Sequence, residues 1–464
     1  MIDTTAVLDT ARYLRNVRPI DPEEIYEYVP GDPHPAVVRE TLRSHVFELG
    51  LREREDGTFV PVEDGPMEST FDGVERFPER WTRALEDLLV ERYGPGWPDD
   101  EAGDRIRERI DRLKEEYFAD ESVSYDEETA VAYAIYHLPD YYAAIQYVLD
   151  ELARAELLPR RCRVLDVGAG VGGPALGFHD FAPEAALVGY DAVEPSDHAA
   201  DLFERLLEES RPSFDTTVYR ERAETFDPEG PYDLLVFANV LSELDAPVAV
   251  LERYLDVLEP DGTVIALEPA EERTATGLRR VERELLDGHP ELNVYAPTVR
   301  LWSGESPTDR GWTFTRKPDI EPPSFQTRLD RGGGGDGRYL NTDVQYAYVL
   351  LRTDGRRAID YEPDPSRVGK FADSERHVTE RIDCVAVKLS PDLGEANPLF
   401  KISDGSEAVD HYAVLTRESA LNESLLRAPY GSLLSFENVL VLWNDDEGAY
   451  NLVVDGETVV DRLT

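Results

Sequence analysis

A short strand that runs directly into a glycine-rich turn constrains the fold of this chain more than any other feature. Residues 164–167 are expected to form a buried strand, residues 168–173 hold the glycines, and a helix is predicted from about residue 174 to 181. Glycines are needed where the backbone must turn sharply out of a strand and approach a ligand without a Cβ in the way. The pattern predicts the first unit of a Rossmann-type α/β domain.

Strands and helices continue to alternate after this turn. The strands are expected at residues 186–190, 216–219, 234–238 and 263–267. Ser196 should cap a helix that reaches residue 209. A second helix should bury Val248, Leu251, Leu255 and Leu258 and end at residues 260–262. This alternation predicts a parallel, doubly wound sheet.

The glycine spacing does not by itself identify the ligand, because it fits the dinucleotide fingerprint as well as an adenosyl-sulfonium site. Asp166 stands two residues before the first glycine, Gly172 adds a third alternate glycine after Gly168 and Gly170, and Asn239 follows the fourth strand. Together these features resemble class I methyltransferases. The resemblance implies S-adenosylmethionine as cofactor, with these five residues lining its site.

Two acids near the end of the second strand are candidates for binding the ribose hydroxyls. Asp191 and Glu194 both qualify by position, and we favour Glu194 because it stands two residues before the capping Ser196. Glu224, after the third strand, is the candidate for binding the adenine amino group.

The residues after the fourth strand are the candidates for catalysis. Methyl transfer from a sulfonium requires the acceptor to be held in line and its proton to be accommodated. Asn239 is expected to do the first. Glu243 is a candidate general base, although an exposed acid at a helix start is the commoner explanation for such a residue. The segment has no cysteine, which disfavours a thiolate mechanism on pyrimidine carbon.

The N-terminal third of the chain reads as two further modules. Residues 1–65 are predicted to form a winged-helix-like domain, with a third helix over residues 35–49 and a hairpin over residues 51–62. Arg39 and Arg43 would point outward from that helix, either toward nucleic acid or as part of a packing module. Residues 66–155 are predicted to be helical, and their aromatic residues to pack against the next domain. These are Tyr133, Tyr136, Tyr141, Tyr142 and Tyr147.

The C-terminal part is predicted to form a second folded domain. The methyltransferase-like domain should span residues 156–356 and be followed by a linker at residues 357–380. Residues 381–464 give a β-β-β-α-β-β order, which suggests an OB-like barrel. Tyr412, Phe436 and Trp443 are candidates to stack on bases, although the barrel interior is expected to hold at least two of them.

The charge of the chain is its compositional outlier. It has 96 acidic against 48 basic residues, and only five of the latter are lysines. This acidic surface is similar to that of proteins from halophilic archaea, where molar salt shortens the Debye length to about 3 Å. Phosphate attraction is then weak, and RNA binding would depend on stacking and shape. No stretch approaches the roughly 20 apolar residues of a membrane helix, so we expect a soluble, cytoplasmic protein.

A succession of short motifs extends the resemblance. The residues 138–144, 164–170, 238–244, 295–297 and 312–314 resemble, in order and spacing, the Rsm-type small-subunit family, whose mitochondrial member is methyltransferase-like protein seventeen. This resemblance implies a partner, the small ribosomal subunit and its RNA. A ribosomal-RNA methyltransferase, a non-catalytic RNA-binding assembly factor and a small-molecule methyltransferase remain open.

The chain departs from that family in one respect. Family members carry cysteines near the last two motifs that hold an iron–sulfur cluster, whereas this chain has Thr298 and Thr313 there and no cysteine between Cys162 and Cys384. We therefore expect no iron–sulfur cluster and no other metal. The region must fold by other means, such as the packing of Trp302, Trp312, Phe314 and Phe325.

Overall fold

A computed structural model describes residues 3–119 and 126–463 of the chain. The chain folds into two compact units. The first comprises Met1–Leu235 and Asp319–Thr342, and the second comprises Val236–Pro318 and Asp343–Thr464. The boundary falls inside strand β6 (Tyr232–Ala238), so this strand contributes to both units. No helix among the described residues is long and apolar enough to cross a membrane.

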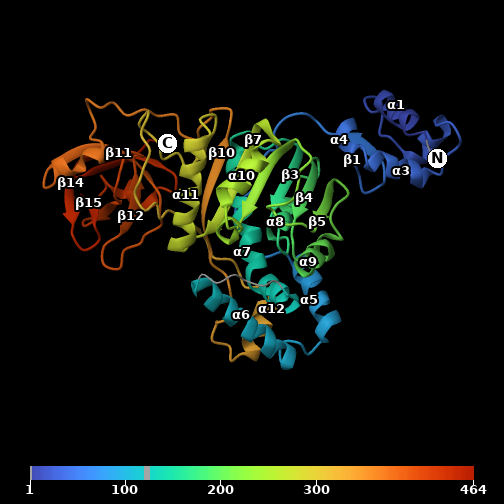
Figure 1. Cartoon of the computed structure of the whole chain (residues 1–464), viewed down its shortest axis with the longest axis horizontal. Helices are drawn as coiled ribbons and strands as arrows, with labels where there is room; N and C mark the ends of the chain where they lie inside the picture. The colour runs from blue at the N-terminus through green and yellow to red at the C-terminus, as the bar shows by residue number, and fades with distance from the viewer. Residues whose placement is uncertain (1–2, 120–125, 464) are drawn as a thin grey trace. The chain divides into compact units, whose positions relative to one another are not determined.

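The first unit contains the glycine turn and the parallel part of the sheet. Its strands follow the order β5-β4-β3-β6. Leu165 of β3 lies opposite Asp191 of β4, and Asp191 lies opposite Thr217 of β5, in parallel register. The elements are β3 (Arg161–Val167), α8 (Gly173–Phe181), β4 (Leu187–Val193), α9 (Asp197–Leu207) and β5 (Phe214–Tyr219) (Figure 1). The predicted Rossmann unit is confirmed, with Ser196 capping α9 through Ala199 N–H.

The second unit continues the sheet in the order β6-β7-β10-β8, with β9 paired to β10. β10 runs antiparallel to β7, β8 and β9, so this part of the sheet adds antiparallel pairs to the parallel strands of the Rossmann unit. The strands are β7 (Leu258–Pro269), β8 (Asn293–Ala296), β9 (Thr315–Lys317) and β10 (Val344–Arg352), and the helices are α10 (Pro247–Leu255) and α11 (Glu272–Gly288).

Helix α10 differs from its predicted register. Leu258 lies in β7, and the buried residues of the helix are Val250, Leu251 and Tyr254. The ring of Tyr254 packs edge-on against Phe237 of β6, 5.7 Å between centroids. A core tyrosine is not distinguishable from a surface one by periodicity, which explains the error.

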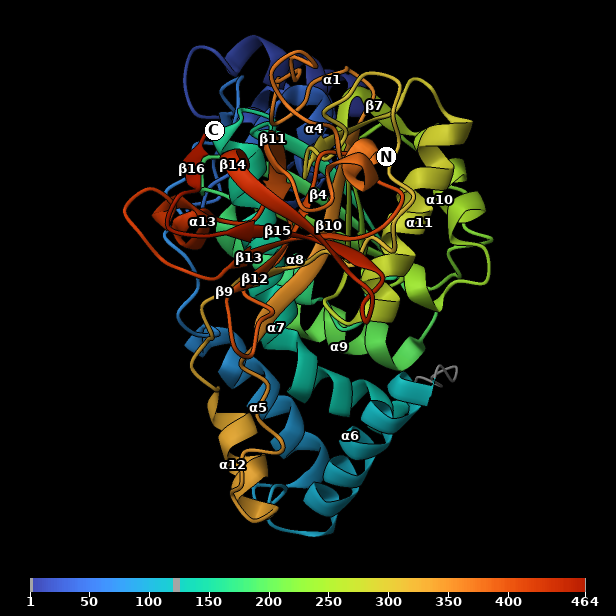
Figure 2. The same ribbon diagram turned by 90° about the vertical axis from the view of Figure 1, so that its left-hand side faces the viewer.

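Long helices complete the first unit (Figure 2): α5 (Glu79–Tyr93), α6 (Glu101–Ala119), α7 (Glu127–Arg154) and α12 (Ser324–Gly332). Glycines let α7 and α8 approach closely, because a Cβ on Gly177 would come within 2.4 Å of Ile145 and 2.6 Å of the Tyr142 carbonyl oxygen. Tyr142 is buried as predicted. Tyr133 and Tyr141 are half-buried and hydrogen-bond to each other, 3.1 Å between hydroxyl oxygens.

At the N-terminus the structure has α1 (Thr4–Leu14), α2 (Pro22–Ile25), α3 (Pro35–Arg43), α4 (Val46–Leu49), β1 (Leu51–Glu53) and β2 (Phe59–Pro61). The predicted third helix is therefore two helices, broken at Ser44 and His45. Arg39 and Arg43 are half-exposed, but both pair with the buried carboxylate of Glu53, at 2.5 Å and 2.6 Å. Their guanidinium groups are thus engaged within the module.

The C-terminal strands close into a barrel (Figure 1). The order β11-β12-β13-β15-β14 returns to β11, with β13 and β15 parallel and the other pairs antiparallel. The elements are β11 (Arg381–Lys388), β12 (Leu399–Ser403), β13 (His411–Leu415), α13 (Glu423–Arg427), β14 (Leu433–Asn444), β15 (Ala449–Val454) and β16 (Val459–Arg462). The helix between the third and fourth strands and the closure of the first on the fourth confirm the OB-type prediction. The last predicted strand is divided into β15 and β16.

The three aromatic candidates of the barrel differ in exposure. Phe436 is fully buried in the core, Tyr412 is half-buried, and Trp443 is 40% exposed. The indole N–H of Trp443 donates to Asp445 at 2.8 Å, and its ring contacts Tyr450 edge-on at 4.8 Å. Only Trp443 of these three therefore presents a large part of its ring to solvent.

The segment before β9 folds against the barrel through hydrogen bonds and through a shared hydrophobic cluster on which Trp302 packs. Leu301 N–H donates to Asp404 O, and the Trp302 indole N–H donates to the Asp404 carboxylate at 2.7 Å. Trp312 and Phe314 stack at 5.6 Å between centroids, whereas Phe325 lies elsewhere, on α12 against Phe77.

The predicted linker is also structured. Phe371 is buried, its backbone N–H donates to Asp404, and its ring stacks on His411 at 4.3 Å. The sequence predicts a linker over residues 357–380, and no local pattern there indicates that Phe371 belongs to the barrel core.

Candidate cofactor and acceptor sites

The turn after β3 is held under the end of β4. Gly168 and Ala169 N–H groups both donate to the Val193 carbonyl oxygen, at 2.8 Å and 3.1 Å. Gly168, Gly170 and Gly172 have positive φ of 75°, 55° and 91°, a region that costs any other residue about 1–2 kcal/mol. The turn therefore needs the positive φ angles that glycine adopts without strain, as the sequence predicts.

The glycines of the turn have different neighbours. A Cβ on Gly172 would come within 2.8 Å of the Phe203 ring, so this position is glycine because of packing. A Cβ on Gly170 would meet no atom within 4 Å. The backbone at Gly170 therefore faces open space, as a ligand that approaches the main chain requires.

Glu194 holds the turn from the end of β4. Its carboxylate accepts hydrogen bonds from Gly170 N–H at 2.9 Å and from Ser196 N–H at 2.7 Å. The side chain is buried, and this burial raises its pKa. Each carboxylate oxygen has a second lone pair, so Glu194 can accept sugar hydroxyls while keeping both backbone contacts.

Asp166 lies beneath the turn and is fully buried. Its Oδ2 accepts a hydrogen bond from the Tyr190 hydroxyl at 2.7 Å, while its Oδ1 has no hydrogen-bond partner among the described residues. Burial raises the pKa of Asp166 to about 7. A buried polar atom without a partner is uncommon in folded proteins, and it fits a site that a ligand completes.

The other two acids of the first unit are placed differently. Asp191 accepts a hydrogen bond from the Tyr232 hydroxyl at 2.7 Å and lies 3.9 Å from Arg163. The carboxylate of Asp191 therefore binds side chains of neighbouring strands, whereas that of Glu194 binds the glycine turn. Glu224 lies in the loop after β5, half-buried and 3.2 Å from Arg222. A hydrogen bond from its own backbone lowers the pKa of Glu224. Its contact with adenine stays a prediction.

The candidates for the acceptor side lie in the second unit. Asn239 has φ of +58°, and its N–H donates to the Leu267 carbonyl oxygen at 2.8 Å. A left-handed residue other than glycine is strained, and such residues concentrate at functional sites. A 3-10 turn, η2 (Leu241–Glu243), follows, and it leaves Glu243 exposed. The catalytic roles of Asn239 and Glu243 stay predictions.

One residue of this region was not predicted from the sequence. Glu268, at the end of β7, is 1% exposed, and its Oε1 accepts a hydrogen bond from Ser242 N–H at 3.2 Å. Burial raises its pKa to about 7. The signal in the sequence is a lone acid that ends the apolar run of residues 263–267. That pattern also fits an acid just outside a strand, so it does not reveal burial.

Potential metal ligands are scattered rather than clustered in the described part of the chain. Over residues 3–119 and 126–463, no group of three or more His, Cys, Asp or Glu side chains is arranged to hold a metal ion. The two cysteines, Cys162 and Cys384, are buried, which raises the pKa of each thiol.

Comparison with known families identifies the central domain. Residues 137–317 match the model of a methyltransferase domain. Residues 4–55 and 372–463 match the N-terminal and C-terminal domains of a family of unknown function, DUF8157. A curated relative from Schizosaccharomyces pombe, an uncharacterized methyltransferase, is 27% identical over 171 residues, which cover 33% of this chain. The match spans 56% of the length of that relative.

The chain is also similar, at low identity, to solved structures of methyltransferases. The plantazolicin methyltransferase BpumL in complex with S-adenosylhomocysteine is 12% identical, with a TM-score of 0.31, over 59% of this chain and 99% of that protein. An S-adenosylmethionine-dependent methyltransferase from Leishmania major is 19% identical, with a TM-score of 0.24, over 33% of this chain and 71% of that protein. At these values neither structure bears on the substrate of this chain.

The chain therefore contains a class I methyltransferase domain, and its cofactor is S-adenosylmethionine. The open space over Gly170, the free lone pairs of Glu194 and the unpaired oxygen of Asp166 fit this group. In the first unit the structure brings together the glycines, Asp166 and Glu194 of the predicted cofactor set.

Proposed function

We propose that this chain methylates RNA of the small ribosomal subunit, in the cytoplasm, as a relative of the Rsm-type family. The main support for the proposal is that a methyltransferase domain and a closed barrel of OB topology occur in the same chain. Barrels of this topology bind oligonucleotides and oligosaccharides through their strands and loops. The order of the five short motifs from residue 138 to residue 314 supports the small subunit as partner.

The residues of the chain support this chemistry as follows. When bound, S-adenosylmethionine supplies a methyl group carried by a sulfonium. Glu194 and the Gly168–Gly172 backbone bind and orient the cofactor, and Asn239 positions the acceptor. Methyl transfer gains most of its rate from such positioning.

The surface of the chain indicates how RNA would be bound. The net charge is −48, and Arg39 and Arg43 pair with Glu53, so phosphate contacts at the N-terminal module are not favoured. Trp443 presents an oriented, 40% exposed indole, which can stack on an unpaired base. Binding by stacking predicts a weak dependence of RNA affinity on salt.

The test has two parts, both in molar KCl, the condition that the acidic composition predicts. Titration calorimetry with S-adenosylhomocysteine measures cofactor binding. Transfer of a tritiated methyl group to small-subunit particles from cells that lack the protein measures activity. We expect binding, transfer, and a single unmodified nucleotide in the small-subunit RNA of those cells.

The alternatives give different results. Binding of the cofactor and of the particles without transfer would identify a non-catalytic assembly factor that keeps the fold. Failure to co-sediment with ribosomal particles in a high-salt gradient would favour a small-molecule methyltransferase. Absence of cofactor binding would contradict any enzymatic role.

A further inference from the structure

Glu268 follows a buried run of residues near the carboxyl end of β7. The side chains of residues 263–267 are at most 3% exposed, and that of Glu268 is 1% exposed. A carboxyl group in such surroundings loses its hydration, which is unfavourable unless hydrogen bonds replace it. Its presence at this position therefore requires an explanation.

Only one oxygen of Glu268 has a partner among the described residues. Oε1 accepts the Ser242 N–H hydrogen bond, whereas Oε2 is buried with no hydrogen-bond partner in the described chain. Leaving a buried acceptor unpaired is unfavourable, because the group has lost its hydration without gaining a partner. The empty lone pairs of Oε2 are positioned to accept a hydrogen bond from a bound molecule.

The position of Glu268 in the sheet supports a role in binding. Ligands of open α/β sheets bind at the carboxyl ends of the strands, and Glu268 is one residue from the end of β7. Asn239, whose backbone is left-handed, donates its N–H to the carbonyl oxygen of Leu267, the residue before Glu268. Trp312 donates its indole N–H to Ala270, two residues after Glu268, at 2.9 Å. An aromatic ring and the Asn239–Glu243 loop are thus anchored on both sides of this carboxyl group.

Glu268 is better suited than Glu243 to receive a proton. Glu243 is exposed, so water solvates its charge. Burial is the main cause that raises the pKa of Glu268 to about 7, and the nearby charge of Glu243 is a smaller cause in the same direction. A general base works best when its pKa lies near the operating pH. Glu268 meets this condition, and Glu243 contributes by its charge.

We propose that Glu268 accepts the proton that the methyl acceptor loses, and that the acceptor is therefore an amino or hydroxyl group. The inference rests on the proposed function. As the bond from the acceptor nitrogen or oxygen to the methyl carbon forms, the carbon–sulfur bond breaks and its electron pair stays on sulfur. The proton leaves the acceptor for Glu268 Oε2. The carboxylate and the sulfonium both become neutral, so the charges balance. A ring nitrogen that carries no hydrogen would not require this group.

The test compares Glu268→Gln with Glu259→Gln in the tritium-transfer assay. Glu259 lies at the opposite end of β7, so the control makes the same chemical change on the same strand. In E268Q, kcat should fall about 100-fold or more. Its KM for particles and its affinity for S-adenosylhomocysteine should stay within about twofold of wild type, as should every parameter of E259Q. Glu268→Asp should recover part of kcat, which distinguishes proton transfer from a failure to fold.

Two pH-dependent measurements add readouts that a structural role would not change. In wild type, kcat should rise with pH and level off above about 7, as Glu268 loses its proton. The other titratable groups near β7 lie on three elements. Glu243 is on η2, Tyr348 is on β10, and Arg279 and Glu282 pair with each other on α11. Infrared spectra of the free wild-type protein minus those of E268Q should show a protonated carboxyl band of Glu268 that titrates near pH 7, since the band of the buried Asp166 is present in both proteins and cancels.

The possible results are distinguishable. Transfer by wild type that persists in E268Q would overturn the role of Glu268 and leave the proposed function intact. So would a kcat that falls in E268Q with no change in its dependence on pH. Cofactor binding without transfer by wild type would overturn the proposed function and the role of Glu268 together.

Discussion

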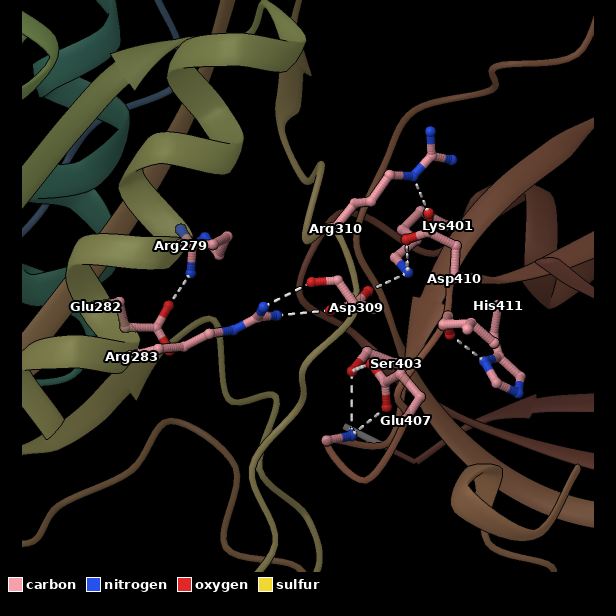
Figure 3. A network of polar contacts seen from close by, with 12 residues as sticks. Arg279, Glu282, Arg283, Asp309, Arg310, Lys401, Ser403, Glu407, Asp410 and His411 are labelled. Atoms are coloured by element: carbon pink, nitrogen blue, oxygen red, sulfur yellow. Dashed lines mark hydrogen bonds and ion pairs between the residues drawn. The ribbon is translucent and has the colours of Figure 1, made fainter. Parts of the chain in front are cut away.

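The ammonium group of Lys401 lies 2.5 Å from the carboxylate of Asp309 and joins the barrel to the segment before β9 (Figure 3). Both side chains are almost fully buried, and Asp410 provides a second carboxylate 2.7 Å from Lys401. Arg283 of α11 pairs with Asp309, so charges alternate from the helix to the barrel. Burial lowers the pKa of Lys401, but the two carboxylates outweigh it and raise the pKa above its ordinary value. The lysine is therefore charged.

Lys401→Met should destabilise the second unit strongly. Removing one partner of a buried ion pair leaves the others uncompensated, at a cost of about 3–5 kcal/mol. Urea unfolding in molar KCl measures this loss. The control is Arg376→Met, since Arg376 forms an exposed pair with Asp373 and should change stability by about 0.5 kcal/mol or less. Equal losses in both variants would show that burial of the Lys401 network does not matter.

Gly170→Trp should abolish cofactor binding and leave the fold intact. The new side chain would occupy the open space over the turn, so affinity for S-adenosylhomocysteine should fall at least about 100-fold, which is roughly 2.8 kcal/mol. Gly355→Trp is the matched control, because Gly355 also has a positive φ and open space around it. Both variants should lose about 1–2 kcal/mol of stability from the left-handed backbone. Calorimetric binding by G170W would place the cofactor elsewhere.

Asp166→Asn should change how stability depends on pH. The pKa of Asp166 is raised to about 7, chiefly by burial. Between its ordinary value near 4 and about 7, the folded protein keeps this proton while the unfolded chain releases it. Raising the pH in that window therefore destabilises wild type relative to D166N, by on the order of 1 kcal/mol per pH unit. Denaturation at several pH values measures the difference. A difference that stays constant from about pH 4 to 8 would contradict the raised pKa.

Gly177→Ala should destabilise the contact between α7 and α8. Its Cβ would come within 2.4 Å of Ile145, and such overpacking costs about 1–3 kcal/mol. Gly277→Ala on α11 meets no atom within 4 Å, and it should stabilise the protein by about 0.5–1 kcal/mol through helix propensity. Thermal unfolding of the two variants should shift in opposite directions. A shift in the same direction would show that close helix approach is not the reason for Gly177.

The amino-acid sequence by itself determined the local features of the cofactor site. A strand that ends in alternating glycines, an acid two residues before them and Glu194 before a capping serine are patterns of adjacent residues, and the structure places them as predicted. The barrel was also predictable, because three strands, one short helix and further strands follow one another along this part of the chain.

Only the tertiary structure decided which acids are buried and which cations are engaged. Glu268 and Glu243 each follow a predicted strand. Glu268 is buried and accepts a hydrogen bond from Ser242 N–H, whereas Glu243 is exposed. The difference arises because burial depends on elements from elsewhere in the chain. In the same way, Lys401 and Asp309 are 92 residues apart, and no local pattern links them. Hydrophobic periodicity reports which face of an element is apolar, whereas the partners of a buried charge are set by contacts between distant segments.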